Sequence, residues 1–127
     1  MTEQFRSRIE KIKKAHELKV EVAREQGRAF EEGWTSAKRT IQAVMEEAMA
    51  NIEGSKWLER ENDLIFCVAV LQSGPCITYR PDRVAQHVAA MTNSNGMEKT
   101  SYYSIADVSS VESVERQMID FLQSILT

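Results

Sequence analysis

Apolar side chains recur at helical spacing through the first 52 residues. Residues 3–52 contain no proline and are rich in Glu, Lys, Arg, Ala and Gln, which favour helix. The apolar positions are three or four residues apart, as expected for one face of a helix. They form a short stretch at Phe5, Ile9 and Ile12, and a longer one from Val22 and Ala23 through Phe30, Trp34, Ala37, Ile41, Val44, Ala48 and Ile52.

Two glycines, Gly27 and Gly33, lie near the point where this pattern weakens, between Lys13 and Arg28. A glycine inside a helix costs about 1 kcal/mol relative to alanine, so we expect a bend or a break near 27–33. Two geometries remain open: a single helix about 70 Å long at ~1.5 Å per residue, or a hairpin of two helices.

The remainder of the chain predicts strands and short helices. Residues 64–71 are apolar on both faces, which is typical of a buried central strand, and 76–79 alternate as its partner across a turn at 72–75. Pro81 and Asp82 predict the start of a helix over 83–91, and residues 100–106 predict a third strand.

A capping box predicts the start of the C-terminal helix. The Ser109 hydroxyl can accept a hydrogen bond from the amide of Glu112, and the Glu112 carboxylate can reach back. The helix that follows has apolar residues at regular helical spacing, namely Val111, Val114, Met118, Phe121, Leu122 and Ile125.

Together these elements predict an α+β fold. A long N-terminal helix or helical hairpin precedes a small β-β-α-β-α domain with a three-stranded, mainly antiparallel sheet. We expect residues 1–53 to be a helical contact region and residues 54–127 to be the small α/β domain. Two short helices cover only one sheet face, so the second face of strand 64–71 requires cover from the N-terminal helix or from another chain.

Charge and hydropathy point to a cytoplasmic protein. The longest apolar run, 64–71, is well short of the roughly 18 residues of a membrane helix, and the first residues lack the apolar core of a signal peptide. The net charge is −3, yet residues 1–28 hold eight Lys and Arg against five Glu. A solvated helix face and a surface that steers an acidic partner both explain this excess.

The two cysteines are expected to be separate reduced thiols. With Leu71 opposite Cys76, Cys67 lies about 13 Å further along the strand at ~3.3 Å per residue. That separation exceeds the roughly 7 Å between Cα atoms that a disulfide allows.

Side chains with catalytic chemistry are sparse, so we expect neither an enzyme nor a metal or cofactor site. His16 and His87 are 71 residues apart, and no CxxC, HxxxH or glycine-rich phosphate loop occurs. Cys76 has no histidine placed to activate it, and Glu pairs such as Glu46-Glu47 lie on solvent-facing helix.

Contact-forming residues are plentiful by comparison, and they predict a non-enzymatic, homo-oligomeric protein-interaction protein of the adaptor or inhibitor kind. We expect a dimer with coiled-coil-like contacts and a protein partner of unknown identity at Arg80, Tyr102 and Lys99. The expected oligomer contacts are Phe30, Trp34, Ala37, Ile41, Val44 and Ala48.

Two alternatives remain open. One is a small-molecule binding or sequestering protein with a pocket at a subunit interface, using Tyr79, Arg80, Tyr102 or Lys99. The other is a nucleic-acid-associated regulator whose basic residues 6–14 track phosphates, although glutamates interleave with these bases.

Overall fold

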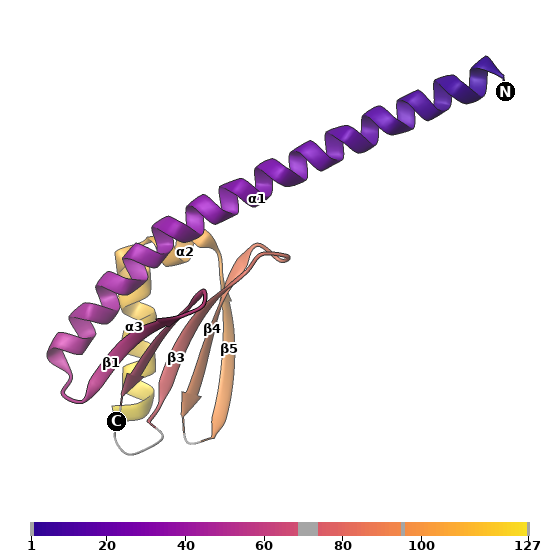
Figure 1. Cartoon of the computed structure of the whole chain (residues 1–127). Coiled ribbons are helices and arrows are strands. Elements are labelled where there is room, and N and C mark those ends of the chain that lie inside the picture. Colours follow the sequence, from indigo (N-terminus) through magenta and orange to yellow (C-terminus); the bar gives the residue numbers. More distant parts are fainter. Residues whose placement is uncertain (1, 69–73, 95, 127) are drawn as a thin grey trace.

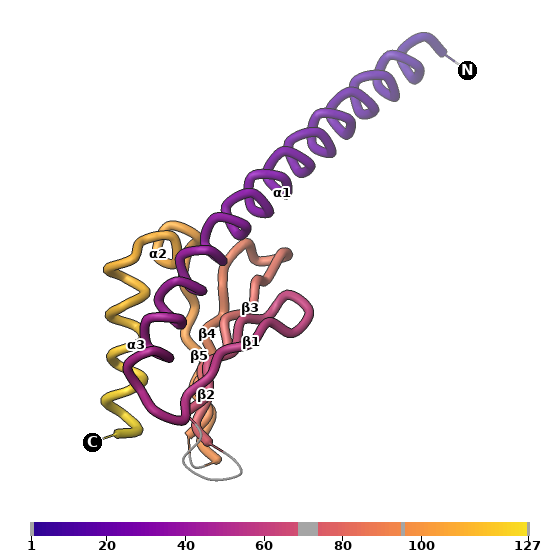
Figure 2. Tube along the Cα trace, turned by 60° about the vertical axis from the view of Figure 1, so that its left-hand side comes forward, coloured from indigo at the N-terminus to yellow at the C-terminus, as the bar shows by residue number. Residues whose placement is uncertain are grey.

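A five-stranded antiparallel sheet with helices on one face forms the body of the molecule (Figures 1 and 2). The computed structural model describes residues 2–68, 74–94 and 96–126. The helices are α1 (Glu3–Asn51), α2 (Ile105–Ser109) and α3 (Val111–Leu126). The strands are β1 (Ser55–Arg60), β2 (Asp63–Val68), β3 (Cys76–Asp82), β4 (His87–Ser94) and β5 (Met97–Tyr103).

The N-terminal helix α1 is continuous, so the hairpin alternative and the expected break are wrong. Its 49 residues span about 74 Å at ~1.5 Å per residue. Thr2 caps its start by accepting a hydrogen bond from the amide of Phe5 at 3.3 Å. Gly33 does not break the helix but brings α1 close to α2, because a Cβ at this position would lie 2.7 Å from Cγ2 of Ile105.

The sheet is a meander in which each strand pairs with the next, in the order β1-β2-β3-β4-β5. The α+β class and the long helix are confirmed, but the three-stranded sheet is wrong by two strands. One is β1, an alternating segment around Trp57. The other is β4, which replaces most of the helix expected over 83–91.

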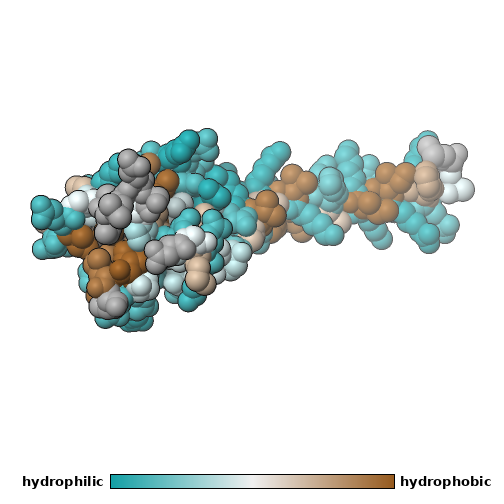
Figure 3. Space-filling view, turned by 90° about the horizontal axis from the view of Figure 1, so that it is seen from below, coloured by the Kyte–Doolittle hydropathy of each residue, from teal (hydrophilic) through white to brown (hydrophobic). Residues whose placement is uncertain are grey.

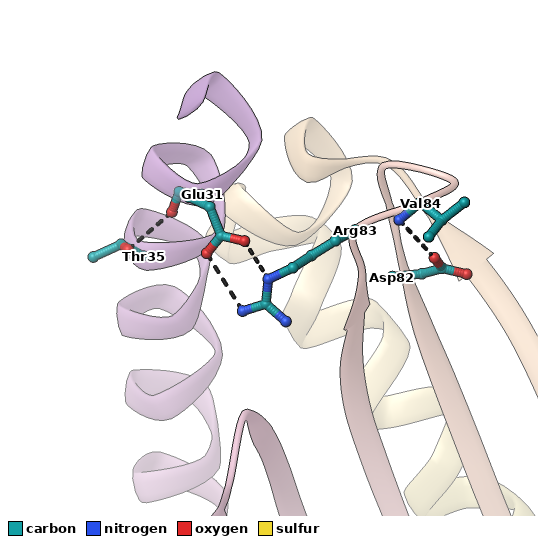
Figure 4. Close-up of polar contacts among 5 residues, drawn as sticks. All are labelled: Glu31, Thr35, Asp82, Arg83 and Val84. Carbon is teal, nitrogen blue, oxygen red and sulfur yellow. Dashed lines mark hydrogen bonds and ion pairs between the residues drawn. The ribbon is translucent and has the colours of Figure 1, made fainter. Parts of the chain in front are cut away.

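The helix expected after Pro81 does not form, and residues 83–86 make a turn between β3 and β4. The Asp82 carboxylate accepts a hydrogen bond from the amide of Val84 at 3.1 Å (Figure 4). It also accepts from the amide of Ala85 at 3.1 Å, in the manner of a helix cap. Gln86 then takes a φ of 56°, which reverses the chain. The following residues alternate as a strand, because Val88 and Ala90 then reach the core while their neighbours face outwards.

The register of β2 and β3 also differs from the expected one. Cys67 lies opposite Cys76, and Phe66 lies opposite Ile77, so the pairing is shifted by four residues. The two cysteines are 4.3 Å apart between Cα atoms and form a disulfide, so the expectation of reduced thiols is wrong. Residues 69–71 of the expected strand and 72–73 of the expected turn lie outside the described residues.

The residues that cap the starts of α2 and α3 differ from the predicted Ser109–Glu112 capping box. A complete capping box joins Ser104 and Asp107 at the start of α2. At the start of α3, Ser110 rather than Ser109 accepts from the amide of Ser113, at 3.4 Å. Ser109 instead belongs to α2, where its hydroxyl donates to the carbonyl of Ile105 at 2.6 Å.

One hydrophobic core joins the second half of α1 to the inner sheet face and to α3. The second half of α1 therefore packs against elements of residues 54–127. The buried core side chains that α1 contributes are Trp34, Ala37, Ile41, Val44 and Met45; those of the remaining elements are Leu64, Phe66, Val68, Ile77, Tyr79, Val88, Ala90, Val108, Val114, Met118 and Phe121. Among the described residues, no helix has the length and apolar character needed to cross a membrane.

Candidate interaction surfaces

The first half of α1 extends away from the body as a single projecting helix (Figures 1 and 2). We call residues 3–28 the arm, because Phe30 is the first buried residue of α1. Phe5 is 50% exposed, Ile9 45% and Ile12 69%. In Figure 3, apolar side chains occur at intervals along this helix between hydrophilic ones. The arm therefore exposes an apolar stripe that no described part of its own chain covers.

Positive charge is concentrated at the free end of the arm. Residues 3–14 hold Arg6, Arg8 and three lysines, against Glu3 and Glu10. Every side chain in this segment is exposed. The arm is thus both apolar and basic.

An ion pair holds the β3–β4 turn against α1 near the base of the arm (Figure 4). Arg83 donates to the carboxylate of Glu31 through both Nε and Nη2, the latter at 3.4 Å to Oε2. Thr35 donates its hydroxyl to the Glu31 carbonyl at 2.9 Å, one turn further along the helix. These contacts connect the sheet to α1 close to the point where the arm leaves the body.

The stripe predicted to contact another chain lies instead in the core of its own chain. Phe30, Trp34, Ala37, Ile41 and Val44 are 0–7% exposed, and Ala48 is half-buried beside them. The inner sheet face needs an apolar cover, and this part of α1 supplies it. These side chains consequently pack against their own chain, and Val44 and Ala48 also line a groove that is described below.

The outer face of the sheet carries two of the three predicted partner-binding residues. Arg80 makes a bidentate contact with Asp63, with Nε 3.1 Å from both carboxylate oxygens and Nη2 2.7 Å from Oδ2. This hydrogen bonding with the Asp63 carboxylate raises the pKa of the Arg80 guanidinium. Tyr102 stands edge-on to His87, with ring centroids 4.7 Å apart. Lys99 lies on β5 but lines a pocket on the opposite face, with Tyr103 and Gln117.

An open pocket of about 740 Å³ lies on the same outer face as Arg80. Its walls come from all five strands and the β1–β2 turn, and they are mostly polar. They comprise Arg60, Glu61, Asp63, Ile65, Cys76, Thr78, Arg80, Met91, Thr92, Asn93 and Glu98. The pocket thus combines the Arg80–Asp63 ion pair with the hydroxyl groups of Thr78 and Thr92.

A second surface, which we call the groove, runs between the end of α1 and α3 and has a volume of about 530 Å³. Its apolar wall residues are Ala43, Val44, Ala48, Ile52, Val111, Met118, Ile119 and Leu122, and its polar ones are Glu47, Asn51 and Glu115. The spacing of apolar residues along the chain did not predict the groove. The available signal was Ile119, an apolar residue beside the core-facing stripe of α3.

The hydroxyl of the buried Tyr79 forms a hydrogen bond within the fold. Tyr79 donates its hydroxyl to Oε1 of Gln117 at 2.9 Å, and burial, with a smaller contribution from Tyr103, raises the pKa of Tyr79. Its burial also removes it from the ligand pocket proposed from the sequence. Within the described ranges, no group of three or more His, Cys, Asp and Glu side chains is placed to hold a metal ion.

Three surfaces are therefore candidates for function: the arm, the outer sheet face and the groove. Only the residues Arg80 and Tyr102 of the predicted partner site share one of these surfaces. Comparisons with known proteins found no protein family, no curated protein and no solved structure that matches this chain.

Proposed function

We propose that this chain is a non-enzymatic, homo-oligomeric interaction protein in which the arm mediates self-association. The observation that carries the proposal is the arm itself, a helix of about 39 Å at ~1.5 Å per residue beyond the body. It exposes Phe5, Ile9 and Ile12 on one stripe. Most helical stability in proteins comes from packing an amphipathic face, so this stripe favours a helix that is covered in the working state.

The outer sheet face is proposed to bind a protein partner. Arg and Tyr are enriched among the residues that dominate binding energy at interfaces. Asp63 holds the Arg80 guanidinium in a bidentate geometry, which lowers the conformational entropy that Arg80 would lose on binding. Tyr102 is exposed beside His87 on the same face. The pKa shifts of Tyr79 and Arg80 follow from burial and ion pairing, which favours a structural role over catalysis.

Size-exclusion chromatography with light scattering tests the self-association. The wild-type chain should elute at twice its 14.5 kDa mass at micromolar concentration. A triple variant, F5S/I9S/I12S, should shift to the monomer mass. A matched control, E10S/K13S/E17S, changes three exposed residues of the arm outside the apolar stripe and should remain dimeric. A wild-type mass of one chain at all concentrations would refute the proposal.

A second candidate function is nucleic-acid binding by the arm, which the exposed bases Arg6, Arg8 and Lys11 favour. Its distinguishing property is an affinity that falls steeply with salt concentration. In that case R6A/R8A/K11A would abolish binding to DNA or RNA and leave the oligomer mass unchanged.

A further inference from the structure

The groove has the chemistry of a docking site for a helix. Two large apolar side chains of α3 beside it remain exposed, Val111 at 46% and Ile119 at 52%. The half-buried Ala48 and Ile52 form the facing wall on α1. An apolar strip between two helices is the typical seat of a third amphipathic helix, which covers it with residues spaced three or four apart.

The electrostatics of the groove select a basic helix. Its described lining residues include two carboxylates, Glu47 and Glu115, and no Lys, Arg or His. The groove also lies beside the C-terminal end of α1, where the backbone carbonyls carry partial negative charge. The last turn of α1 has no basic residue to offset this charge. A cationic segment would therefore be stabilised here by both the side chains and the helix end.

The free end of the arm has matching properties. Its apolar residues Phe5, Ile9 and Ile12 follow a four-three spacing, and the α1 wall of the groove has Val44, Ala48 and Ile52 at four-residue spacing. Residues 3–14 hold five bases and two acids, whereas the groove is acidic. The arm and the groove thus have similar apolar spacing and opposite charge.

The arm of one chain cannot reach the groove of that chain. Because α1 is continuous, Ile9 and Ala48 are separated by about 58 Å of helix at ~1.5 Å per residue. The segment that occupies the groove must come from a second copy. We propose that the arm of each chain lies in the groove of the other, antiparallel to the end of α1. This inference rests on the self-association proposed above and assigns its contact surface.

The antiparallel arrangement determines which residues would face one another. Phe5 would lie beside Ile52, Ile9 beside Ala48, and Ile12 beside Val44, so the residue numbers of each pair add to 56 or 57. A nearly constant sum follows from any antiparallel pairing, and its midpoint here falls near residue 28, where the arm leaves the body. A two-fold axis at this point makes both contacts identical and closes the assembly as a dimer.

Charge reversal with complementation tests the arrangement in the full-length chain by sedimentation equilibrium. The groove variant E47K/E115K and the arm variant R8E/K11E should each weaken self-association by about tenfold or more, because like charges then face each other in both contacts. An equimolar mixture should restore dimers. Each basic arm then meets an acidic groove, and each acidic arm meets a basic groove. The control E46K/D120K makes the same charge change on exposed residues of α1 and α3 outside the groove, and it should dimerise like the wild type.

Each outcome is informative. Wild-type dimers with unaltered affinity in both charge variants would overturn the groove contact and leave arm-mediated self-association standing. A monomeric wild-type chain would overturn both proposals. Failure of the mixture to recover dimers would also overturn the reciprocal arrangement. If the groove variant does not fold, the arm variant still decides, because its exposed side chains lie outside the body.

Discussion

Gly33 on α1 lies against the side chain of Ile105 on α2. A Cβ added there would be 2.7 Å from Cγ2 of Ile105 and 3.7 Å from both Cβ and Cγ1 of the same side chain. Favourable carbon–carbon contacts require roughly 3.5–4.0 Å. Ile105 is β-branched and begins a helix that the Ser104–Asp107 capping box holds in place. The clash therefore cannot be relieved by a simple rotation of a flexible side chain.

Two effects of opposite sign determine the result of G33A. Overpacking costs about 1–3 kcal/mol, and the higher helix propensity of alanine contributes about 1 kcal/mol. We expect a net loss of up to about 2 kcal/mol in the free energy of unfolding. The control is G27A, where an added Cβ meets nothing within 4 Å. This variant should be neutral or more stable by up to about 1 kcal/mol.

Urea unfolding at one fixed protein concentration, followed by circular dichroism, measures both variants, since self-association would otherwise shift the apparent stability. A second pair, I105A and G33A/I105A, removes Cγ2 and should eliminate the penalty of G33A. If G33A is as stable as G27A in the wild-type background, the close approach of α1 and α2 does not constrain position 33.

Three further predictions concern the core and the hairpin. Reduction of the Cys67–Cys76 disulfide opens a short loop, with a sequence separation of 9, so a reductant should destabilise the protein by about 2–3 kcal/mol. The melting temperature of C67S/C76S should not respond to reductant. Because burial raises the pKa of Tyr79, the neutral phenol is favoured in the folded state. This stability is fully present below the unfolded pKa of about 10 and is lost as the pH rises towards the folded pKa. Y79F should lose about 0.5–1.5 kcal/mol at pH 7 and decline less in melting temperature above pH 10. F121A should lose about 3–5 kcal/mol in urea unfolding because the ring is buried, and the exposed I119A should lose much less.

Some features of the fold follow from local pattern alone. The spacing of apolar residues predicted the helices over 3–52 and from Val111, because one face of a helix repeats every 3.6 residues whatever it packs against. The apolar run 64–71 and the alternating segment 76–79 likewise predicted two neighbouring strands, and β2 and β3 lie there. A missed hairpin also had a local signal, since Asn95-Gly96 is a typical two-residue turn sequence.

The register of β2 and β3, by contrast, needed the tertiary structure. A shift of four residues keeps every side chain on its original face, because the side-chain period of a strand is two. The apolar pattern is therefore equally satisfied by both registers, and only one of them places Cys67 opposite Cys76. Local pattern is also ambiguous after Pro81. Asp82 caps a turn there, and the same residue could equally cap the start of a helix. The strand replaced the helix because Val88 and Ala90 extend the buried sheet face.

Some properties of the interaction surfaces likewise follow from the sequence, and others depend on the tertiary structure. The sequence alone determined that α1 carries an apolar stripe and a basic first segment, because both depend only on residue type and spacing. The tertiary structure decided that Phe30 to Val44 cover the sheet of their own chain while Phe5, Ile9 and Ile12 project beyond it. It also decided that Arg80 and Tyr102 share a face that Lys99 does not. The physical reason is that periodicity specifies which side of an element is apolar, whereas the length and placement of the sheet specify how much of that side is covered.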